Sequence, residues 1–161
     1  MVFCFVAAGT ELAKVKEFVR QRNLKNVLTL PYQPVEELAA SLSAADLHVV
    51  VMGDPFVGIV HPCKIYNILR LGVPFLYIGP PESHVTEMLP RAAVGDWAHL
   101  FRHGSAEGVA TCIEQRAQAS ARRPEEEMRL AGEFSSDKLL PRFVALLETV
   151  DNPEMLAGTK P

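Results

Sequence analysis

The chain has 161 residues, a formal net charge of −3 at pH 7 and a hydrophobic share of 48%. This length suits one domain with its own core, and no apolar run approaches the roughly 18 residues of a membrane-spanning helix. The acidic balance excludes the broad positive field that holds a nucleic-acid backbone, so we expect no nucleic-acid partner. The three cysteines, Cys4, Cys63 and Cys112, lack the spacing of a zinc site, and we interpret them as reduced thiols of a cytoplasmic protein.

The first part of the sequence alternates between short apolar runs and amphipathic segments. The run from Val2 to Ala7 predicts a strand that is buried on both faces. The segment from Thr10 to Arg20 then predicts a helix, because its apolar residues recur on one face. A second strand is predicted from Val27 to Leu30, and Pro34 opens a second helix.

The same alternation continues through the middle of the chain. The valine-rich run from Leu47 to Met52 predicts a third strand, and a long loop from Gly53 to His61 follows it. Pro62 suits the start of a helix over Cys63 to Leu71, and Val73 to Ile78 predicts a fourth strand. Because parallel strands need a crossover helix between them, this order predicts an α/β fold in which helices cover both faces of a parallel sheet.

Beyond Gly79 the periodicity is weaker. We expect a short helix over Glu82 to Leu89, a last strand over Ala92 to Val94 and a helix over Ser105 to Gln118. A strongly amphipathic helix around Leu139 to Val150 closes the pattern. The sequence therefore predicts one domain over residues 1–150 and a flexible tail over residues 151–161.

The loop before the third predicted helix is the best candidate for a ligand site. In an open parallel sheet, ligands bind outside the carboxyl ends of the strands, where this loop lies. It leads into a helix whose first N–H groups are unpaired and electropositive, which favours a bound phosphate. Lys64 either binds such an anion or extends into solvent, and His61 either donates to it or serves as a local cap or surface group.

Four segments around these elements carry a family resemblance. The segment HPCKIYNILRLGVPFL, from His61 to Leu76, resembles the PSK-x-Y-x-x-L-x-x-G-x-P pattern of bacterial glycosyltransferases of the family 4, group 1 type. Upstream, FVAAGTE resembles that family's strand ending in G-x-E, NVLTLPY with the later Glu37-Leu38 resembles its next unit, and ADLHVVV resembles its A-D-hydrophobic strand. The order and spacing of the segments agree with the family over residues 2–118.

The resemblance implies that this chain is the C-terminal, Rossmann-like half of a two-domain GT-B enzyme. That half would bind a nucleotide-diphosphate sugar, and an N-terminal domain would present a polysaccharide or cell-envelope acceptor. Peripheral membrane contact would run through that other domain. We expect no metal and no cofactor besides the donor substrate, and the sequence identifies no catalytic residue.

The resemblance also assigns the donor-binding positions. Pro31 and Tyr32 would lie against the nucleobase, and Asn67 would meet the ribose. Many members have glutamates at the positions of Ile59 and Asn67, so the usual pair of acids is absent here. The complete set implied for donor binding is Gly9, Pro31, Tyr32, Gly58, Ile59, Val60, His61, Lys64 and Asn67.

In the family, a strand-and-helix unit precedes the position of Val2 and lies at the centre of the sheet. Without that unit and the acceptor domain, we expect weak or no donor binding and no transfer by this chain alone. The strands that flank the empty position would pair directly, recruit another chain or leave free edges.

Two other functions stay open at this stage. One is a sugar-nucleotide epimerase of the same architecture, which would need acids and histidines near the diphosphate, where the loop offers Asp54 and His61. The other is a degenerate, non-catalytic docking domain, whose contact surface would be the apolar helix around Leu139 to Val150.

Overall fold

The computed structural model describes residues 1–119 and 125–150, so the tail predicted for residues 151–161 lies outside the described residues. The strands are β1 (Phe3–Val6), β2 (Val27–Leu30), β3 (His48–Val51), β4 (Phe75–Ile78) and β5 (Ala98–Phe101). The helices are α1 (Thr10–Gln21), α2 (Leu38–Ser43), α3 (Lys64–Leu71), α4 (His84–Glu87), α5 (Ala106–Gln118), α6 (Glu125–Glu133) and α7 (Ser136–Val150). Short 3-10 turns lie at η1 (Val35–Glu37), η2 (Asp54–Phe56) and η3 (Arg91–Ala93).

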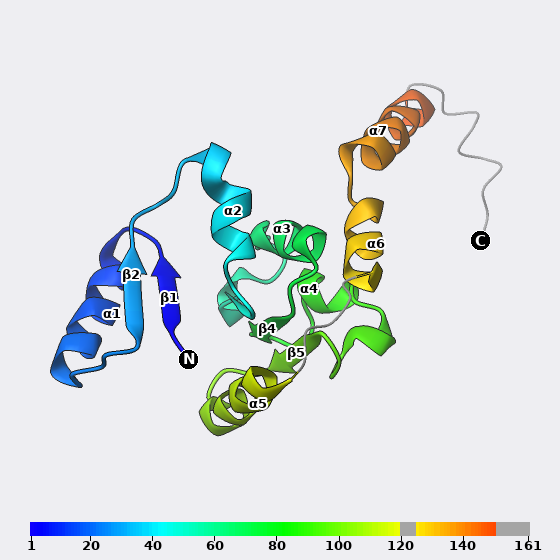
Figure 1. The fold of residues 1–161 in the computed structure, drawn as a ribbon. Helices are drawn as coiled ribbons and strands as arrows, with labels where there is room; N and C mark the ends of the chain where they lie inside the picture. Colours follow the sequence, from blue (N-terminus) through cyan, green and yellow to red (C-terminus); the bar gives the residue numbers. More distant parts are fainter. Residues whose placement is uncertain (120–124, 151–161) are drawn as a thin grey trace.

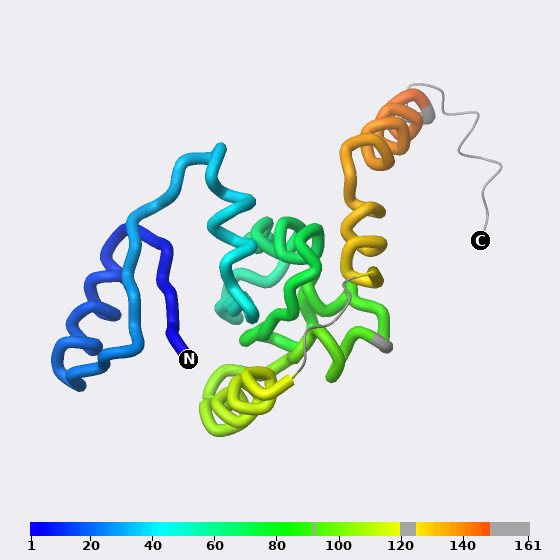
Figure 2. Tube along the Cα trace, in the orientation of Figure 1, coloured from blue at the N-terminus to red at the C-terminus, as the bar shows by residue number. Residues whose placement is uncertain are grey.

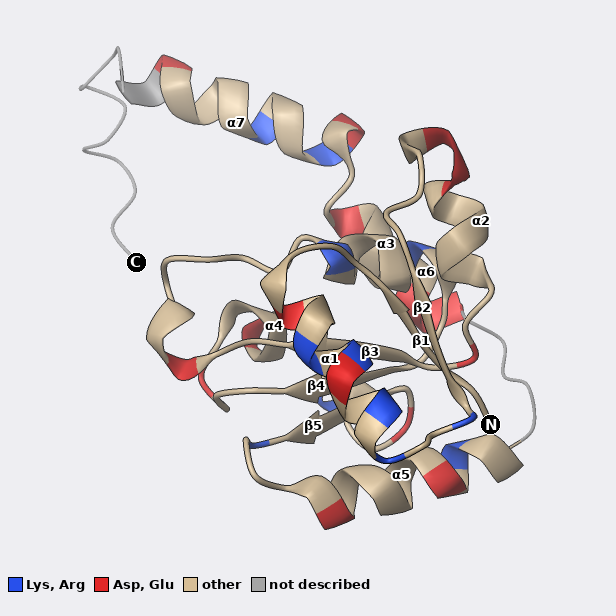
Figure 3. Ribbon diagram, turned by 90° about the vertical axis from the view of Figure 1, so that its left-hand side faces the viewer, with Lys and Arg blue, Asp and Glu red and all other residues tan. Residues whose placement is uncertain are grey.

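The predicted α/β class is confirmed, because every described strand pair is parallel and helices lie on both sides of the strands. The strands form two sheets instead of one: β1 pairs with β2, and β3, β4 and β5 follow one another in a second sheet. Figures 1 and 3 show α3 on one side of the second sheet and α5 on the other. Among the described residues, no ladder joins β1 to β3.

The last strand does not lie where the sequence analysis placed it. Residues 91–93 form η3, and the strand is Ala98–Phe101. The reason is a turn at Gly95, whose φ of +87° suits glycine, followed by Trp97 and Ala98 at 0% exposure. The chain thus turns between Ala93 and the strand, and residues on both sides of the turn are buried in the core.

The core belongs to the second sheet. Its buried apolar residues come from β3, α3, β4, α4 and the segment around β5, and they are Val50, Met52, Ile65, Ile68, Leu69, Phe75, Tyr77, Val85, Ala93, Trp97 and Ala98. Residues 1–47, which include β1, α1 and β2, contribute no buried residue. Figure 2 shows the blue N-terminal unit on one side of the green central part and the orange α7 extending away on the other.

Charge is confined to the helices and loops. None of the five described strands contains a lysine, arginine, aspartate or glutamate, whereas α1 carries both signs along its length (Figure 3). No helix in residues 1–119 or 125–150 combines the length and apolar character needed to cross a bilayer. The strands therefore follow the pattern of a parallel sheet that is covered on both faces, although α1 is the one helix drawn against β1 and β2 in the described part of the chain.

Candidate functional site

The loop between β3 and α3 folds back on itself before the helix begins. The N–H groups of Ile59 and Val60 both donate to the carbonyl of Phe56, at 3.0 and 2.9 Å. Gly58 has a φ of +75°, in the left-handed region, and glycine adopts this conformation without the strain of a side chain. The loop is therefore closed by its own hydrogen bonds, and the amides of Ile59 and Val60 are already used.

Two amides at the helix entrance remain available. Within the described residues, Cys63, Ile65 and Tyr66 donate to carbonyls of the entrance itself, whereas no backbone acceptor is found for the N–H of His61 or of Lys64. Such unpaired N–H groups at the first turn of a helix attract an anion. The entrance thus offers two backbone N–H donors for a phosphate, fewer than the first turn of a helix can provide.

Three side chains meet at this entrance, one each from the loop before α3, from α3 and from the start of α4. The rings of His61 and His84 stack edge to face with centroids 4.1 Å apart, and the ring of Tyr66 lies 5.2 Å from that of His61. The Tyr66 hydroxyl and His84 Nε2 are 3.1 Å apart, within hydrogen-bond distance. This His61–Tyr66–His84 cluster joins the loops that follow β3 and β4, at the edge where a parallel sheet binds ligands.

Burial, with the charge of His84 as a smaller cause, lowers the pKa of His61. Its Nε2 atom is buried, and no hydrogen-bond partner is present among the described residues. Burial also raises the pKa of Tyr66, which keeps the phenol protonated. At neutral pH the cluster therefore holds a neutral imidazole and a hydroxyl, both able to donate to an oxygen.

His84 takes its position from a short capped helix. The hydroxyl of Ser83 accepts from the N–H of Thr86 at 3.4 Å, and Thr86 Oγ1 in turn accepts from the N–H of Ser83 at 3.0 Å. This reciprocal capping box fixes the first turn of α4, so that His84 directly follows a rigid cap.

Lys64 has a different environment from the one that the sequence analysis considered. Its Nζ donates to the carbonyl of Val49 in β3 at 3.0 Å. Although the residue as a whole is exposed, the protein around the ammonium removes enough water to lower the pKa of Lys64. In this structure the ammonium satisfies a strand carbonyl instead of extending into solvent.

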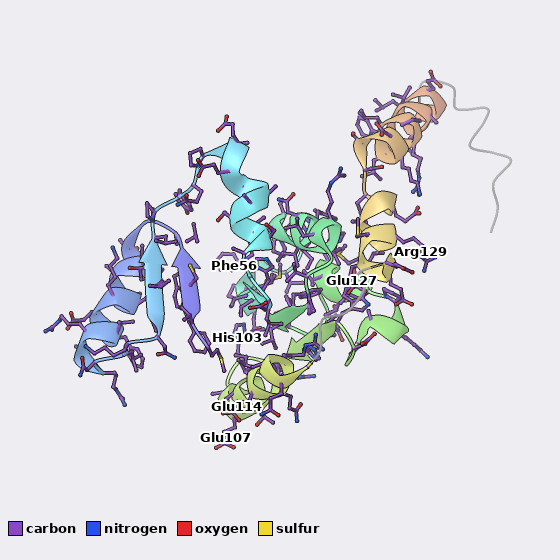
Figure 4. All side chains as sticks on the ribbon, in the orientation of Figure 1. Phe56, His103, Glu107, Glu114, Glu127 and Arg129 are labelled. Carbon is purple, nitrogen blue, oxygen red and sulfur yellow. The ribbon has the colours of Figure 1, made fainter. Side chains whose placement is uncertain are left out.

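A second link joins the loops after β3 and β5. His103 Nε2 lies 2.8 Å from the carbonyl of Met52 and 3.8 Å from Asp54 Oδ1. Figure 4 labels His103 near the start of α5 and Phe56 in the loop after β3. His103, Tyr66 and His84 are absent from the predicted set, and the only sequence signal for His84 is its place just after a strand.

The remaining predicted residues divide between the two sheets. Asn67 lies on the exposed side of α3, one turn after the entrance, and Ile59 is 79% exposed in the loop. Gly9 follows β1, whereas Pro31 and Tyr32 follow β2, and Tyr32 is 70% exposed. No described hydrogen bond or ring contact joins these three residues to the α3 entrance. The structure thus gathers Gly58 to Asn67 and leaves the others with the separate sheet.

The described part of the chain contains no group of three histidine, cysteine, aspartate or glutamate side chains that could hold a metal ion. A donor set of two imidazoles and a phenol, next to free helix N–H groups, suits an anionic oxygen better than a cation. The chemistry that this arrangement can perform is binding and stabilisation of negative charge.

Comparison with known proteins finds one related sequence. Over 72 residues, which are 45% of its length, this chain is 33% identical to "Putative colanic acid biosynthesis glycosyl transferase WcaI" of Escherichia coli (strain K12). Those residues make up 18% of that protein, so the chain spans a small part of its length. No family model and no solved structure matches the chain. The chain is therefore related over part of its length to a glycosyl transferase.

Proposed function

We propose that the chain is the donor-binding portion of a GT-B glycosyltransferase of the family 4, group 1 type. The reaction would move a glycosyl unit from a nucleotide-diphosphate sugar to a polysaccharide or cell-envelope acceptor. The observation that carries this proposal is the 33% identity to WcaI over 72 residues. Parallel strands with polar loops at their carboxyl ends support it.

In this proposal the nucleotide sugar is a substrate, and neither a metal nor a cofactor takes part. In the same proposal an acceptor domain is the partner, and the reaction takes place in the cytoplasm. The chain's own contribution is to hold the donor, because the groups that would activate an acceptor belong to that other domain.

The diphosphate would lie at the entrance of α3. The free N–H groups of His61 and Lys64, together with the His61 and His84 rings, would donate to its oxygens. Donors that are already fixed in place stabilise the charge that develops on the leaving diphosphate. Gly58 to Val60 would shape the loop around it, and Asn67, one turn later, can accept one ribose hydrogen bond and donate another.

Gly9, Pro31 and Tyr32 fit this proposal only when the two sheets act together. The side chain of Tyr32 is exposed at the end of β2, where an aromatic ring can stack on a base. Contact between such a base and a phosphate at α3 requires β2 to approach that helix.

The experiment is a calorimetric titration of the chain with uridine and guanosine diphosphates. We expect weak, saturable binding of one of them, and about a tenfold loss of affinity in His61→Ala and in His84→Ala, the effect of one hydrogen bond to a charged group. Glu107→Gln is the matched control, since Glu107 is exposed on α5, away from the cluster (Figure 4). The corresponding nucleosides should bind more weakly, because they lack the phosphates.

Two results would contradict the proposal in different ways. Glycosyl transfer by the purified chain would show that no acceptor domain is needed. Absence of saturable binding by either nucleotide, in a sample shown to be folded, would favour the non-catalytic docking domain. Its contact surface would be α7, where exposed apolar residues include Leu139, Leu140, Phe143, Val144 and Leu147.

A further inference from the structure

The two nitrogens of the His84 ring have different surroundings. Nε2 lies 3.1 Å from the Tyr66 hydroxyl, whereas no hydrogen bond to Nδ1 is found among the described residues. His84 is exposed at the start of α4, so Nδ1 is the ring nitrogen that is left for a bound ligand. Whether His84 donates to that ligand or accepts from it depends on whether Nδ1 carries a proton.

The direction of the hydrogen bond between Tyr66 and His84 follows from the chemistry of the two groups. A phenol is a stronger donor than a neutral imidazole N–H, and an imidazole nitrogen is a stronger acceptor than a phenol oxygen. Burial raises the pKa of Tyr66, so its hydroxyl keeps the proton at neutral pH. The hydroxyl therefore donates to Nε2, and in the neutral His84 ring the proton then lies on Nδ1.

The His84 ring is restrained by a second contact, with His61. The two rings meet edge to face, with their centroids 4.1 Å apart. A half-turn of the His84 ring would exchange Nε2 with a carbon atom and break its hydrogen bond to Tyr66. One hydrogen bond and one ring contact thus fix which nitrogen of His84 is free.

The Tyr66 ring also contacts an aromatic residue from late in the chain. Phe134 lies between α6 and α7, and its ring centroid is 5.1 Å from that of Tyr66 at an interplanar angle of 49°. This separation is within the range of stabilising aromatic pairs. α6 packs along α3, with Leu130 and Ala131 against the core, so the packing of α6 sets the position of Phe134 (Figure 1).

We propose that Tyr66 and Phe134 are positioning residues of the anion site at the entrance of α3. Phe134 fixes the Tyr66 ring, and the Tyr66 hydroxyl holds the proton of His84 on Nδ1. In the opposite tautomer Nδ1 would present a lone pair, which repels a phosphate oxygen. The ligand of this site, a diphosphate, rests on the proposed function, whereas the tautomer of His84 is a property of the free chain. In this way α6, which is remote from the entrance in sequence, takes part in the site.

Nitrogen-15 NMR of the histidine rings tests the tautomer in the full chain without ligand. The chemical shifts of the two ring nitrogens show which one carries the proton, and His84→Gln identifies the signals of His84. We expect the Nδ1–H form in the wild-type chain at mildly alkaline pH, where imidazoles are neutral. Tyr66→Phe removes the hydroxyl and keeps the ring, and it should shift His84 toward the Nε2–H form that free neutral histidine prefers.

Phe134→Ala should produce part of the same shift, although Tyr66 keeps its hydroxyl. Phe134→Tyr retains an aromatic ring and should keep the wild-type tautomer. Phe143→Ala is the matched control, because that ring is 57% exposed in α7 and has no described ring contact with the cluster. A lower unfolding temperature of Phe134→Ala with an unchanged tautomer would give Phe134 a merely structural role and overturn its part of the proposal.

Titration with uridine and guanosine diphosphates separates this proposal from the proposed function. We expect about a fivefold loss of affinity in Tyr66→Phe and in Phe134→Ala, and no loss in Phe143→Ala. An Nε2–H tautomer in the wild-type chain, or the same tautomer in the wild-type chain and in Tyr66→Phe, overturns the positioning role whether or not a nucleotide binds. The Nδ1–H form in a folded chain that binds neither nucleotide would support the positioning role and remove the donor site.

Discussion

The unit β1–α1–β2 and the sheet β3–β4–β5 are built from similar sequence and differ in burial. The strand FCFV of β1 is as apolar as FLYI of β4, yet Phe3 and Phe5 are 38% and 41% exposed, whereas Phe75 and Leu76 are fully buried. Apolar side chains stabilise a fold only when water is removed from them. An apolar run therefore marks a strand, while the neighbours of that strand decide whether it belongs to a core.

The cause lies in the number of layers. β4 has a strand on each side and helices on both faces, whereas β1 has one strand and one helix. A two-stranded sheet is marginal by itself in water. The residues of α1 that face its sheet, such as Leu12 and Val15, are accordingly only half-buried.

The largest expected difference between the regions comes from two matched truncations. Phe75→Ala should lower the free energy of unfolding by about 3–5 kcal/mol, because it opens a cavity in a filled core. Phe5→Ala in β1 should cost less than about 1 kcal/mol, because the ring already contacts water. Urea unfolding followed by fluorescence of Trp97 measures both. Equal losses would mean that β1 is buried in solution.

A smaller effect is expected at Gly79, which follows β4. A Cβ placed there would lie 2.6 Å from the Tyr77 hydroxyl and 2.8 Å from the Met52 carbonyl. Gly79→Ala should therefore destabilise the chain by about 1–3 kcal/mol, as overpacking does. Gly132→Ala is the control: a Cβ at this position, near the C-terminal end of α6, meets no atom within 4 Å, and the change should stabilise by up to about 1 kcal/mol. Thermal unfolding should show opposite shifts.

The smallest expected effect is a pH dependence of the stability. It arises in the core region, since residues 1–47 contain no histidine. Burial, partly offset by the hydrogen bond to the Leu42 carbonyl and assisted by the charge of Lys64, lowers the pKa of His48 below 6.5. The unfolded chain thus binds the proton more readily, so stability is level above pH 6.5 and falls as the pH drops from there toward the folded pKa.

Urea midpoints measured between neutral and mildly acidic pH check this expectation. In His48→Gln, whose amide can still donate to the Leu42 carbonyl, the acid-dependent loss should be smaller. An unchanged pH profile would assign the loss to other groups, such as His61 and His99, whose pKa values burial also lowers.

Local sequence signals were sufficient for much of the fold. Pro62 and Gly72 bracket α3 as expected, and Gly72 has the left-handed φ of +65° that ends a helix. The strand β5 was missed because its alternation is weak and Trp97 lies just before it. The division into two sheets could not be predicted from the sequences of β1 and β3, because the pairing of a strand depends on which other strand lies beside it in the fold.

The site was predictable only where it is continuous in sequence. The segment Gly58 to Asn67 lies together because one loop and one helix contain it. The contact of His61 with His84 joins the loop before α3 to the start of α4, and the hydrogen bond from Lys64 to Val49 joins α3 to β3. Neither has a periodic signature. The sequence signal that remains is chemical, because polar residues after the carboxyl end of a parallel strand indicate a ligand site even when they match no motif.

The positions of the cysteine thiols allow the distance between the two regions to be measured. Cys4 is exposed in β1 and Cys63 is exposed just before α3, whereas Cys112 is buried in α5. Nitroxide labels attached through maleimide would therefore modify one position in each region and spare the third. Electron paramagnetic resonance between the two labels would then give a distance distribution: a narrow one for two sheets held together, and a broad one for sheets that move independently.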